Sequence, residues 1–203
     1  RKDKDFEEYL EELDPTHPAE ARYAALFHVA HLITKATETS GAGKHASVLD
    51  ACNEHPVVRL LVGMIDDYGT DDQIPPFILS TLVNLSCIDP DMVIDGGGFE
   101  LLLRYVSIPK GQEKEETATR NQYYAVAGVY NLSANDTCAQ QLVDNGVDKI
   151  LEKLTKSPNE ETSRHATYTL QNLEPLRPTS ATQEAPQSKS PMKRLTAMLP
   201  SKS

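Results

Sequence analysis

The segment Val126-Ala-Gly-Val-Tyr-Asn131-Leu-Ser133 occurs four times in this chain in related form. The other three copies show the same order of apolar and polar positions: Leu79-Ser-Thr-Leu-Val-Asn84-Leu-Ser86, Thr167-Tyr-Thr-Leu-Gln-Asn172-Leu-Glu174 and Leu26-Phe-His-Val-Ala-His31-Leu-Ile33. Apart from Thr167, apolar residues stand five and two places before the Asn or His and one place after it. This spacing is typical of one apolar stripe on a helix, so four amphipathic helices are predicted.

The copies that end near residues 33, 86 and 133 are each followed by two further helical patterns. A short candidate helix comes first, at residues 46–53, 90–95 and 137–145, and a second apolar helix follows at residues 57–64, 99–106 and 147–154. Pro56, Gly98 and Gly146 stand immediately before the second helices and mark the turns. The three Asn residues are 47 and 41 places apart, and a period of about 40 to 47 residues is typical of stacked helical repeats.

In these residues the chain resembles the armadillo-repeat family. The resemblance rests on Asn84-Leu-Ser, Asn131-Leu-Ser and Asn172-Leu at the ends of the third helices and on the Asp144-Asn-Gly146 turn. It implies an all-α fold, a short right-handed α-solenoid of about three armadillo-like repeats plus flanking helices. The expected organisation is an acidic N-terminal helix or cap at residues 1–18, a repeat domain at 19–175 and an extended or disordered basic tail at 176–203.

The resemblance also implies where a partner binds. In armadillo proteins the Asn column lines a concave groove, in which each amide pairs with the backbone of an extended peptide. The groove residues expected here are Asn84, Asn131, Asn172 and His31 from that column, with Phe77, Tyr124, His165 and Tyr168 as an aromatic wall. The alternative is that the amides bond only within their own repeat and that Phe77 packs in the core. Nuclear-import members carry a Trp four residues before the Asn, and the absence of Trp here disfavours a receptor for basic signals.

Charge is unevenly distributed along the chain. Residues 1–175 hold 15 basic and 29 acidic side chains, whereas residues 176–203 hold 5 basic and 1 acidic. A body with a net charge of about −14 repels phosphate, so nucleic acid is not an expected partner and a basic protein segment is favoured. The simpler interpretation is an acidic surface that keeps the protein in solution. No run approaches the roughly 20 apolar residues of a membrane helix, so no membrane insertion is expected.

Cys52, Cys87 and Cys138 stand far apart, which fits neither a disulfide framework nor a zinc site. They indicate reduced thiols in an intracellular protein, cytoplasmic by default. Because the sequence opens at Arg1, an upstream targeting peptide stays open, and with it an organelle or a cilium. Glycosylation sequons begin at Asn84, Asn131 and Asn135, and would suit a secreted glycoprotein. The first two lie inside apolar helical patterns, where a glycan would disrupt packing, which disfavours that interpretation.

No motif predicts catalysis, a metal or a cofactor. Ser40-Gly-Ala-Gly-Lys44-His45 has the look of a phosphate loop, but the first glycine of that pattern would fall at Glu38, and His45 replaces the hydroxyl residue that meets magnesium. His28 and His31 lie three apart on one helical face, yet the sequence places no third ligand near them. We therefore expect a non-enzymatic protein without cofactors.

Two non-enzymatic functions remain open. The first is an interaction adaptor that binds a peptide or helix of a partner protein in its groove. The second is a permanent structural subunit of a large mitochondrial, ciliary or cytoskeletal assembly that uses loops and tails, and an ordered tail after Thr179 would favour it. In that tail Ser190, within Lys189-Ser-Pro-Met-Lys193-Arg194, fits a proline-directed phosphorylation site, although such strings are common by chance.

Overall fold

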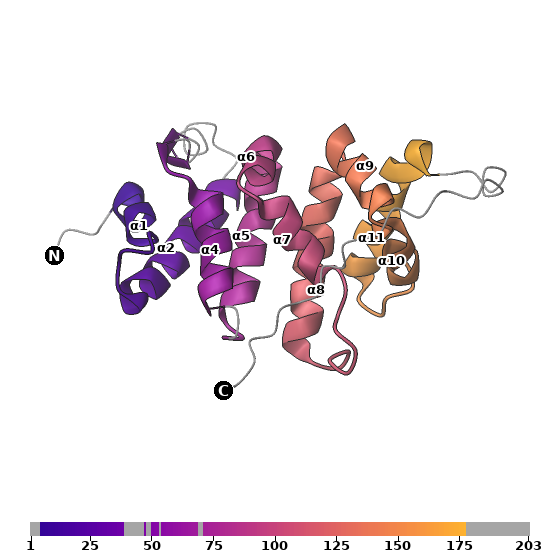
Figure 1. The fold of residues 1–203 in the computed structure, drawn as a ribbon, viewed down its shortest axis with the longest axis horizontal. Helices are drawn as coiled ribbons and strands as arrows, with labels where there is room; N and C mark the ends of the chain where they lie inside the picture. Colours follow the sequence, from indigo (N-terminus) through magenta and orange to yellow (C-terminus); the bar gives the residue numbers. More distant parts are fainter. Residues whose placement is uncertain (1–4, 39–46, 48–49, 53, 69–70, 178–203) are drawn as a thin grey trace, which may run out of the picture.

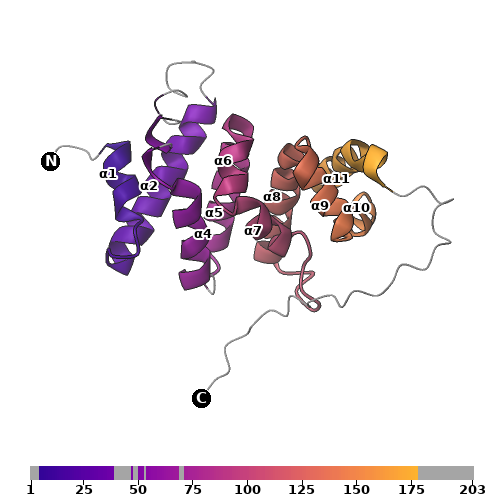
Figure 2. The ribbon, with the colours of Figure 1, turned by 45° about the horizontal axis from the view of Figure 1, so that its top comes forward.

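The structure of the protein is a computed structural model that describes residues 5–38, 47, 50–52, 54–68 and 71–177. Its helices follow one another along the long axis of the molecule, from α1 at one end to α11 at the other (Figures 1 and 2). In chain order they are α1 (Phe6–Glu12), α2 (Ala19–Glu38), α4 (Val57–Tyr68), α5 (Ile74–Ile88), α6 (Pro90–Asp95), α7 (Gly98–Tyr105), α8 (Glu116–Leu132), α9 (Asp136–Asp144), α10 (Val147–Leu154), α11 (Glu160–Leu173) and the 3-10 helix η1 (Glu174–Leu176).

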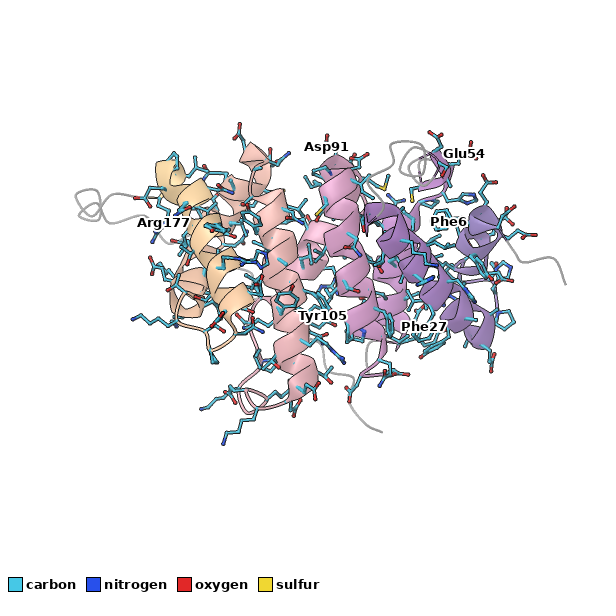
Figure 3. All side chains as sticks on the ribbon, turned by 180° about the vertical axis from the view of Figure 1, so that it is seen from behind. Phe6, Phe27, Glu54, Asp91, Tyr105 and Arg177 are labelled. Atoms are coloured by element: carbon cyan, nitrogen blue, oxygen red, sulfur yellow. The ribbon has the colours of Figure 1, made fainter. Side chains whose placement is uncertain are left out.

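The predicted all-α solenoid is confirmed. The third helices of the repeats, α2, α5, α8 and α11, lie side by side in one layer, each packed against the next (Figure 3). The second helices α4, α7 and α10 pack against α5, α8 and α11 respectively and form the opposite layer (Figure 1). The first helices of the second and third repeats are α6 and α9. Of the short helix expected at residues 46–53, residues 47 and 50–52 are described and helical, and the other half lies outside the described residues.

Polar side chains fix where several helices begin. Asp89, Asn135 and Asn159 each accept a hydrogen bond from the backbone N–H three residues further on, at 2.9 to 3.1 Å, and so cap α6, α9 and α11. Such a cap satisfies one of the N–H groups that the first turn of a helix leaves without a partner. Asn135 therefore has a structural role in the chain, because its side chain sets the start of α9.

The turn before α7 corrects the predicted register of the second repeat. The residues that enter the second helices with positive φ are Gly97 (φ 82°) and Gly146 (φ 70°), so Gly97 rather than Gly98 corresponds to Gly146. Gly98 is the first residue of α7 and matches Val147, the first residue of α10. The alignment of Phe99 with Val147 was one residue out, because three consecutive glycines precede Phe99 and only one of them takes the left-handed conformation.

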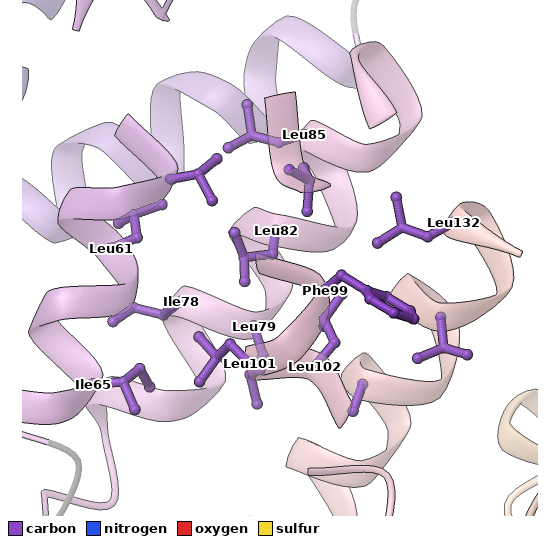
Figure 4. Close-up of a cluster of buried hydrophobic side chains, with 14 of the residues drawn as sticks. Leu61, Ile65, Ile78, Leu79, Leu82, Leu85, Phe99, Leu101, Leu102 and Leu132 are labelled. Carbon is purple, nitrogen blue, oxygen red and sulfur yellow. The ribbon is translucent and has the colours of Figure 1, made fainter. Parts of the chain in front are cut away.

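A continuous apolar core runs between the two layers. Leu82 and Leu85 of α5, Phe99 of α7 and Leu132 of α8 belong to one cluster of apolar side chains, and all four are fully or almost fully buried (Figure 4). The second and third helices of the middle repeat approach closely at Gly128, where a β-carbon would lie 2.7 Å from a methyl group of Leu102. The repeats therefore share one core and do not bury their apolar stripes separately.

Helix α1 covers the free side of α2. Arg22 of α2, 3% exposed, donates from Nε to the carbonyl oxygen of Leu13 at 3.1 Å. From Nη1 the same side chain donates to Asp67 Oδ2 at 2.9 Å and to the hydroxyl of Tyr68 at 3.2 Å. One buried guanidinium therefore joins the turn after α1, helix α2 and the end of α4.

At the other end the described part of the chain extends to Arg177. It therefore includes the first two residues of the tail that was expected at 176–203. The guanidinium of Arg177 forms ion pairs with Glu152 and with Asp148, the latter at 3.5 Å, and both acids belong to α10. Residues 178–203, which hold the rest of the predicted tail and Ser190, lie outside the described residues.

We predict that Leu132→Ala lowers the free energy of unfolding by about 2 to 5 kcal/mol, because it leaves a cavity where a fully buried side chain meets Phe99. Denaturation in guanidinium chloride, followed by circular dichroism, measures this change. Leu176→Ala is the matched control, because Leu176 is 37% exposed, and its effect should stay below about 0.5 kcal/mol. Equal effects of the two substitutions would contradict the assigned register.

Candidate partner-binding face

The three predicted ladder amides each bind the preceding repeat. In every case the side-chain Nδ2 donates to a hydroxyl oxygen on the neighbouring third helix: Asn84 to Thr34 at 3.0 Å, Asn131 to Ser86 at 2.9 Å and Asn172 to Ser133 at 2.8 Å. The amides do not bond the backbone of their own repeat, which was the alternative interpretation of the sequence. They connect α2 to α5, α5 to α8 and α8 to α11.

The hydroxyl groups explain the Ser of the Asn-Leu-Ser motif. Ser86 and Ser133 donate to the carbonyl oxygens of Val83 and Tyr130 in their own helices, both at 2.7 Å, and thereby present a lone pair to the amide of the next repeat. Their acceptor role depends on this orientation. In the last described repeat Glu174 takes the place of Ser, and no described helix beyond it supplies an amide.

The amide oxygens remain available for a partner. Asn131 uses its nitrogen further, towards the carbonyl oxygen of Val83 at 3.4 Å and the sulfur of Cys87 at 3.2 Å. Within the described part of the chain, Oδ1 of Asn84, Asn131 and Asn172 accepts no hydrogen bond. A row of free acceptors on neighbouring helices suits the N–H groups of an extended backbone. We call the surface formed by α2, α5, α8 and α11 around these amides the ladder face; His31 lies in the same column and is exposed.

One aromatic pair borders the ladder face between α2 and α5. Phe27 and Phe77 meet edge to face with ring centroids 4.5 Å apart, and Phe27 is 40% exposed. The predicted wall residue Phe77 is thus half-buried at the surface and not enclosed in the core. Phe27 was not expected as a site residue, although its place four residues before His31 puts it on the same helical stripe.

A second aromatic cluster lies where α8 meets α11. The ring of Tyr130 is 5.5 Å from His165 and 6.0 Å from Tyr168, and Tyr123 is 6.1 Å from His165. Tyr168 is 44% exposed. Two of the predicted wall residues, His165 and Tyr168, therefore share a cluster, whereas Tyr123 and Tyr130 were missed because their contact with them crosses from one helix to the next.

A pocket of about 180 Å³ lies between the two aromatic groups. It is formed between α5 and α8 by Gln73, Pro76, Phe77, Ser80, Arg120 and Tyr124. The structure thus brings the predicted residues Phe77 and Tyr124 to one site. Arg120 was not predicted, although it stands eleven residues, three helical turns, before Asn131 and therefore on the ladder stripe.

Burial changes the titration of groups around this face. Partial burial holds the pKa of His165 below its usual value; Glu161 opposes this shift and Arg164 reinforces it. Burial also raises the pKa of the Cys52 thiol to about 12 and that of the Cys138 thiol to about 11. Cys87, beside Asn131, is exposed.

The described residues also bear on a metal site and on membrane-spanning helices. Among these residues no three His, Cys, Asp or Glu side chains gather as a metal site would require. His28 stacks on the ring of Tyr9 at 4.3 Å, which gives it a packing role. None of the helices in the described part combines the length and apolar character needed to cross a membrane. The loop of residues 40–45 lies outside the described residues.

Neither a protein-family model nor a curated protein matches the chain, but solved structures do. An engineered protein superimposes with a TM-score of 0.60 and 22% identity, over 84% of this chain and 63% of its own. A designed armadillo repeat protein in complex with the peptide (KR)4 superimposes with a TM-score of 0.59 and 16% identity, over 85% of this chain and 70% of its own. For a second designed armadillo repeat protein the TM-score is 0.53 and the identity 18%, over 83% of this chain and 82% of its own. The chain therefore has an armadillo-like repeat fold.

We predict that a thiol reagent such as N-ethylmaleimide modifies one cysteine, Cys87, in the native protein at pH 8. The other two thiols are buried and have raised pKa values, so they react only after unfolding in guanidinium chloride. Mass spectrometry of the intact protein and of its peptides counts and locates the modification. Rapid reaction of Cys52 or Cys138 in the native state would contradict their placement in the core.

We predict that His165 contributes to a loss of stability in mild acid. Because its folded-state pKa lies below the unfolded value of 6.5, the unfolded chain takes up more protons as the pH falls through this region. The free energy of unfolding then falls between about pH 7.5 and pH 5.5. The free energy of unfolding of the His165→Gln variant should fall less over the same interval, as measured by urea denaturation at each pH. Parallel losses in both proteins would exclude His165 as a source.

Proposed function

We propose that this chain is a non-enzymatic protein–protein interaction module that binds an extended peptide of a partner along the ladder face. The observation that carries the proposal is the row of three amides whose nitrogens are engaged between repeats and whose oxygens are free. The row supplies acceptors at regular intervals, and the two aromatic clusters beside it supply apolar contact area.

An extended peptide suits this row better than a helix. The N–H groups in the middle of a helix are already bonded to its own carbonyl oxygens, whereas an extended segment presents free N–H groups along its length. Because each amide already donates to a hydroxyl of the neighbouring helix, its orientation is set before a peptide arrives. Less conformational freedom is therefore lost on binding.

Two further considerations support a protein partner. A designed protein with the same fold was solved in complex with the peptide (KR)4. The excess of acidic side chains in residues 1–175 favours basic residues in the parts of a partner that lie over the acidic surfaces. The alternative of a permanent structural subunit depended on the tail after Thr179, which is outside the described residues.

The amides of Asn131 and Asn172 test this function against their structural role. We predict that Asn131→Ala/Asn172→Ala weakens binding of peptides selected from a phage-displayed library of random 12-residue sequences by about 10-fold or more. Fluorescence anisotropy with the synthesised, labelled peptides measures the affinity. The same variant should lose about 0.5 to 1.5 kcal/mol of stability for each inter-repeat hydrogen bond.

The matched control is Ser86→Ala/Ser133→Ala, which removes the same two inter-repeat hydrogen bonds but leaves both amides in place. It should cost similar stability and weaken peptide affinity much less than the asparagine variant does, because both amide oxygens remain and only their fixed orientation is lost. If both variants lose affinity equally, the amides act only through the fold, and the proposal fails. It also fails if selection gives no peptide that binds the wild type.

A further inference from the structure

Arg120 is an exposed cation without an acidic partner among the described residues. Arg22, Arg104, Arg164 and Arg177 each form at least one ion pair with an acidic side chain. Arg120 forms none within the described residues, although the body of the protein carries many more acidic than basic groups. Of the described arginines, Arg59 alone shares this property, and it lines a different cavity, between α4 and α6.

The pocket beside Arg120 combines apolar and polar walls. Between α5 and α8, Pro76, Phe77 and Tyr124 form its apolar side, and Gln73 and Ser80 supply polar atoms. Its volume of about 180 Å³ exceeds the roughly 150 Å³ of an engineered cavity that admits benzene. One aromatic or leucine side chain therefore fits.

Glu116, one turn before Arg120 on α8, forms no ion pair with it within the described residues, and acids on neighbouring elements have other partners. Asp71 accepts the backbone N–H of Gln73 at 2.9 Å through Oδ1 and the hydroxyl of Tyr23 at 3.4 Å through Oδ2. Glu161, on the far side of α8, pairs with Arg164. The guanidinium at the pocket therefore keeps its full set of donors for a ligand, and a carboxylate matches their fork-like geometry.

We propose that this pocket reads one position of the partner: it takes an apolar side chain, aromatic or leucine, while Arg120 binds a carboxylate two residues away in the same peptide. The proposal rests on the proposed function, because it takes the peptide to lie extended across the ladder face. In an extended chain, side chains two residues apart point to the same side, whereas adjacent ones point to opposite sides. The specificity is thus for apolar-x-acid in either direction, near the first turns of α5 and α8. Three helical turns, about 16 Å, separate Arg120 from Asn131, and about five residues of extended chain span that distance.

The probes are labelled pools of 11-residue peptides with a fixed central Phe and otherwise random sequence. One set of pools carries Glu two residues from the Phe, on either side, and matched pools carry Gln or Lys there or Glu directly adjacent to the Phe. Binding to the full chain is measured by fluorescence anisotropy in about 150 mM salt, where long-range charge effects are largely screened. We expect a Glu pool at spacing two to bind about two- to fivefold more tightly than the Gln and adjacent-Glu pools.

Two arginine variants separate this contact from the net charge. Arg120→Gln should abolish the preference for Glu over Gln, and Arg120→Glu should reverse it towards Lys. Arg59→Gln changes the net charge by the same amount on another surface and should leave the preference unchanged. Neither arginine is buried or paired, so folding is not at risk.

The outcomes distinguish the two proposals. If the wild type binds the Glu and Gln pools equally, or if Arg59→Gln acts as Arg120→Gln does, this inference is overturned. The proposed function still stands in that case when Asn131→Ala/Asn172→Ala weakens the same binding much more than Ser86→Ala/Ser133→Ala does. If no pool binds and the random 12-residue library gives no binder either, both proposals fall together.

Discussion

A repeat of this chain cannot bury its own apolar stripe, so every repeat depends on contact with the next one, and the fold rests on that constraint. Leu85 and Leu132 satisfy it by full burial between the layers. The bond from Asn131 to Ser86 adds direction, because an amide and a hydroxyl 2.9 Å apart fix how the third helices are placed relative to each other. A hydrogen bond contributes only about 0.5 to 1.5 kcal/mol net, so apolar contact supplies most of the stability and the amides set the alignment. Asn-Leu-Ser therefore encodes, in three residues, an alignment group, a core side chain and the acceptor for the next repeat.

The helices and their core columns were predictable because the apolar stripe is a local pattern that recurs along the chain. The turn before α7 was not, because the sequence offers three glycines and only packing distinguishes them. A β-carbon on Gly96 would lie 2.4 Å from Val58, and one on Gly98 would lie 2.6 Å from Val93, so those two positions require a missing side chain. Gly97 has open space and is needed for its positive φ. Identical residues in one turn thus meet different demands, and the sequence alone does not separate them.

The candidate site was predictable to the extent that it repeats. The Asn column was found because three copies agree, but the direction of its hydrogen bonds depends on how two repeats are placed, which no single repeat encodes. Phe27 and Tyr130 were missed for the same reason, since each gains its meaning from a ring on the neighbouring helix. The net charge predicted a basic partner over the whole body, whereas the pocket between α5 and α8 is lined by a cation, Arg120. A global sum of charges says little about one contact, because exposed charges more than about 10 Å apart are largely screened in salt.

Recurrence and variation on the ladder face have different consequences for recognition. In the proposed binding mode, amides that repeat from helix to helix would hold any extended backbone equally well when it shifts along the row, so by themselves they would fix neither sequence nor register. Only features that do not repeat would hold a partner in one register. On this face Phe27, Tyr168 and Arg120 are such features. In that mode, repeated residues supply affinity towards a backbone, and residues that break the repeat supply selectivity among side chains.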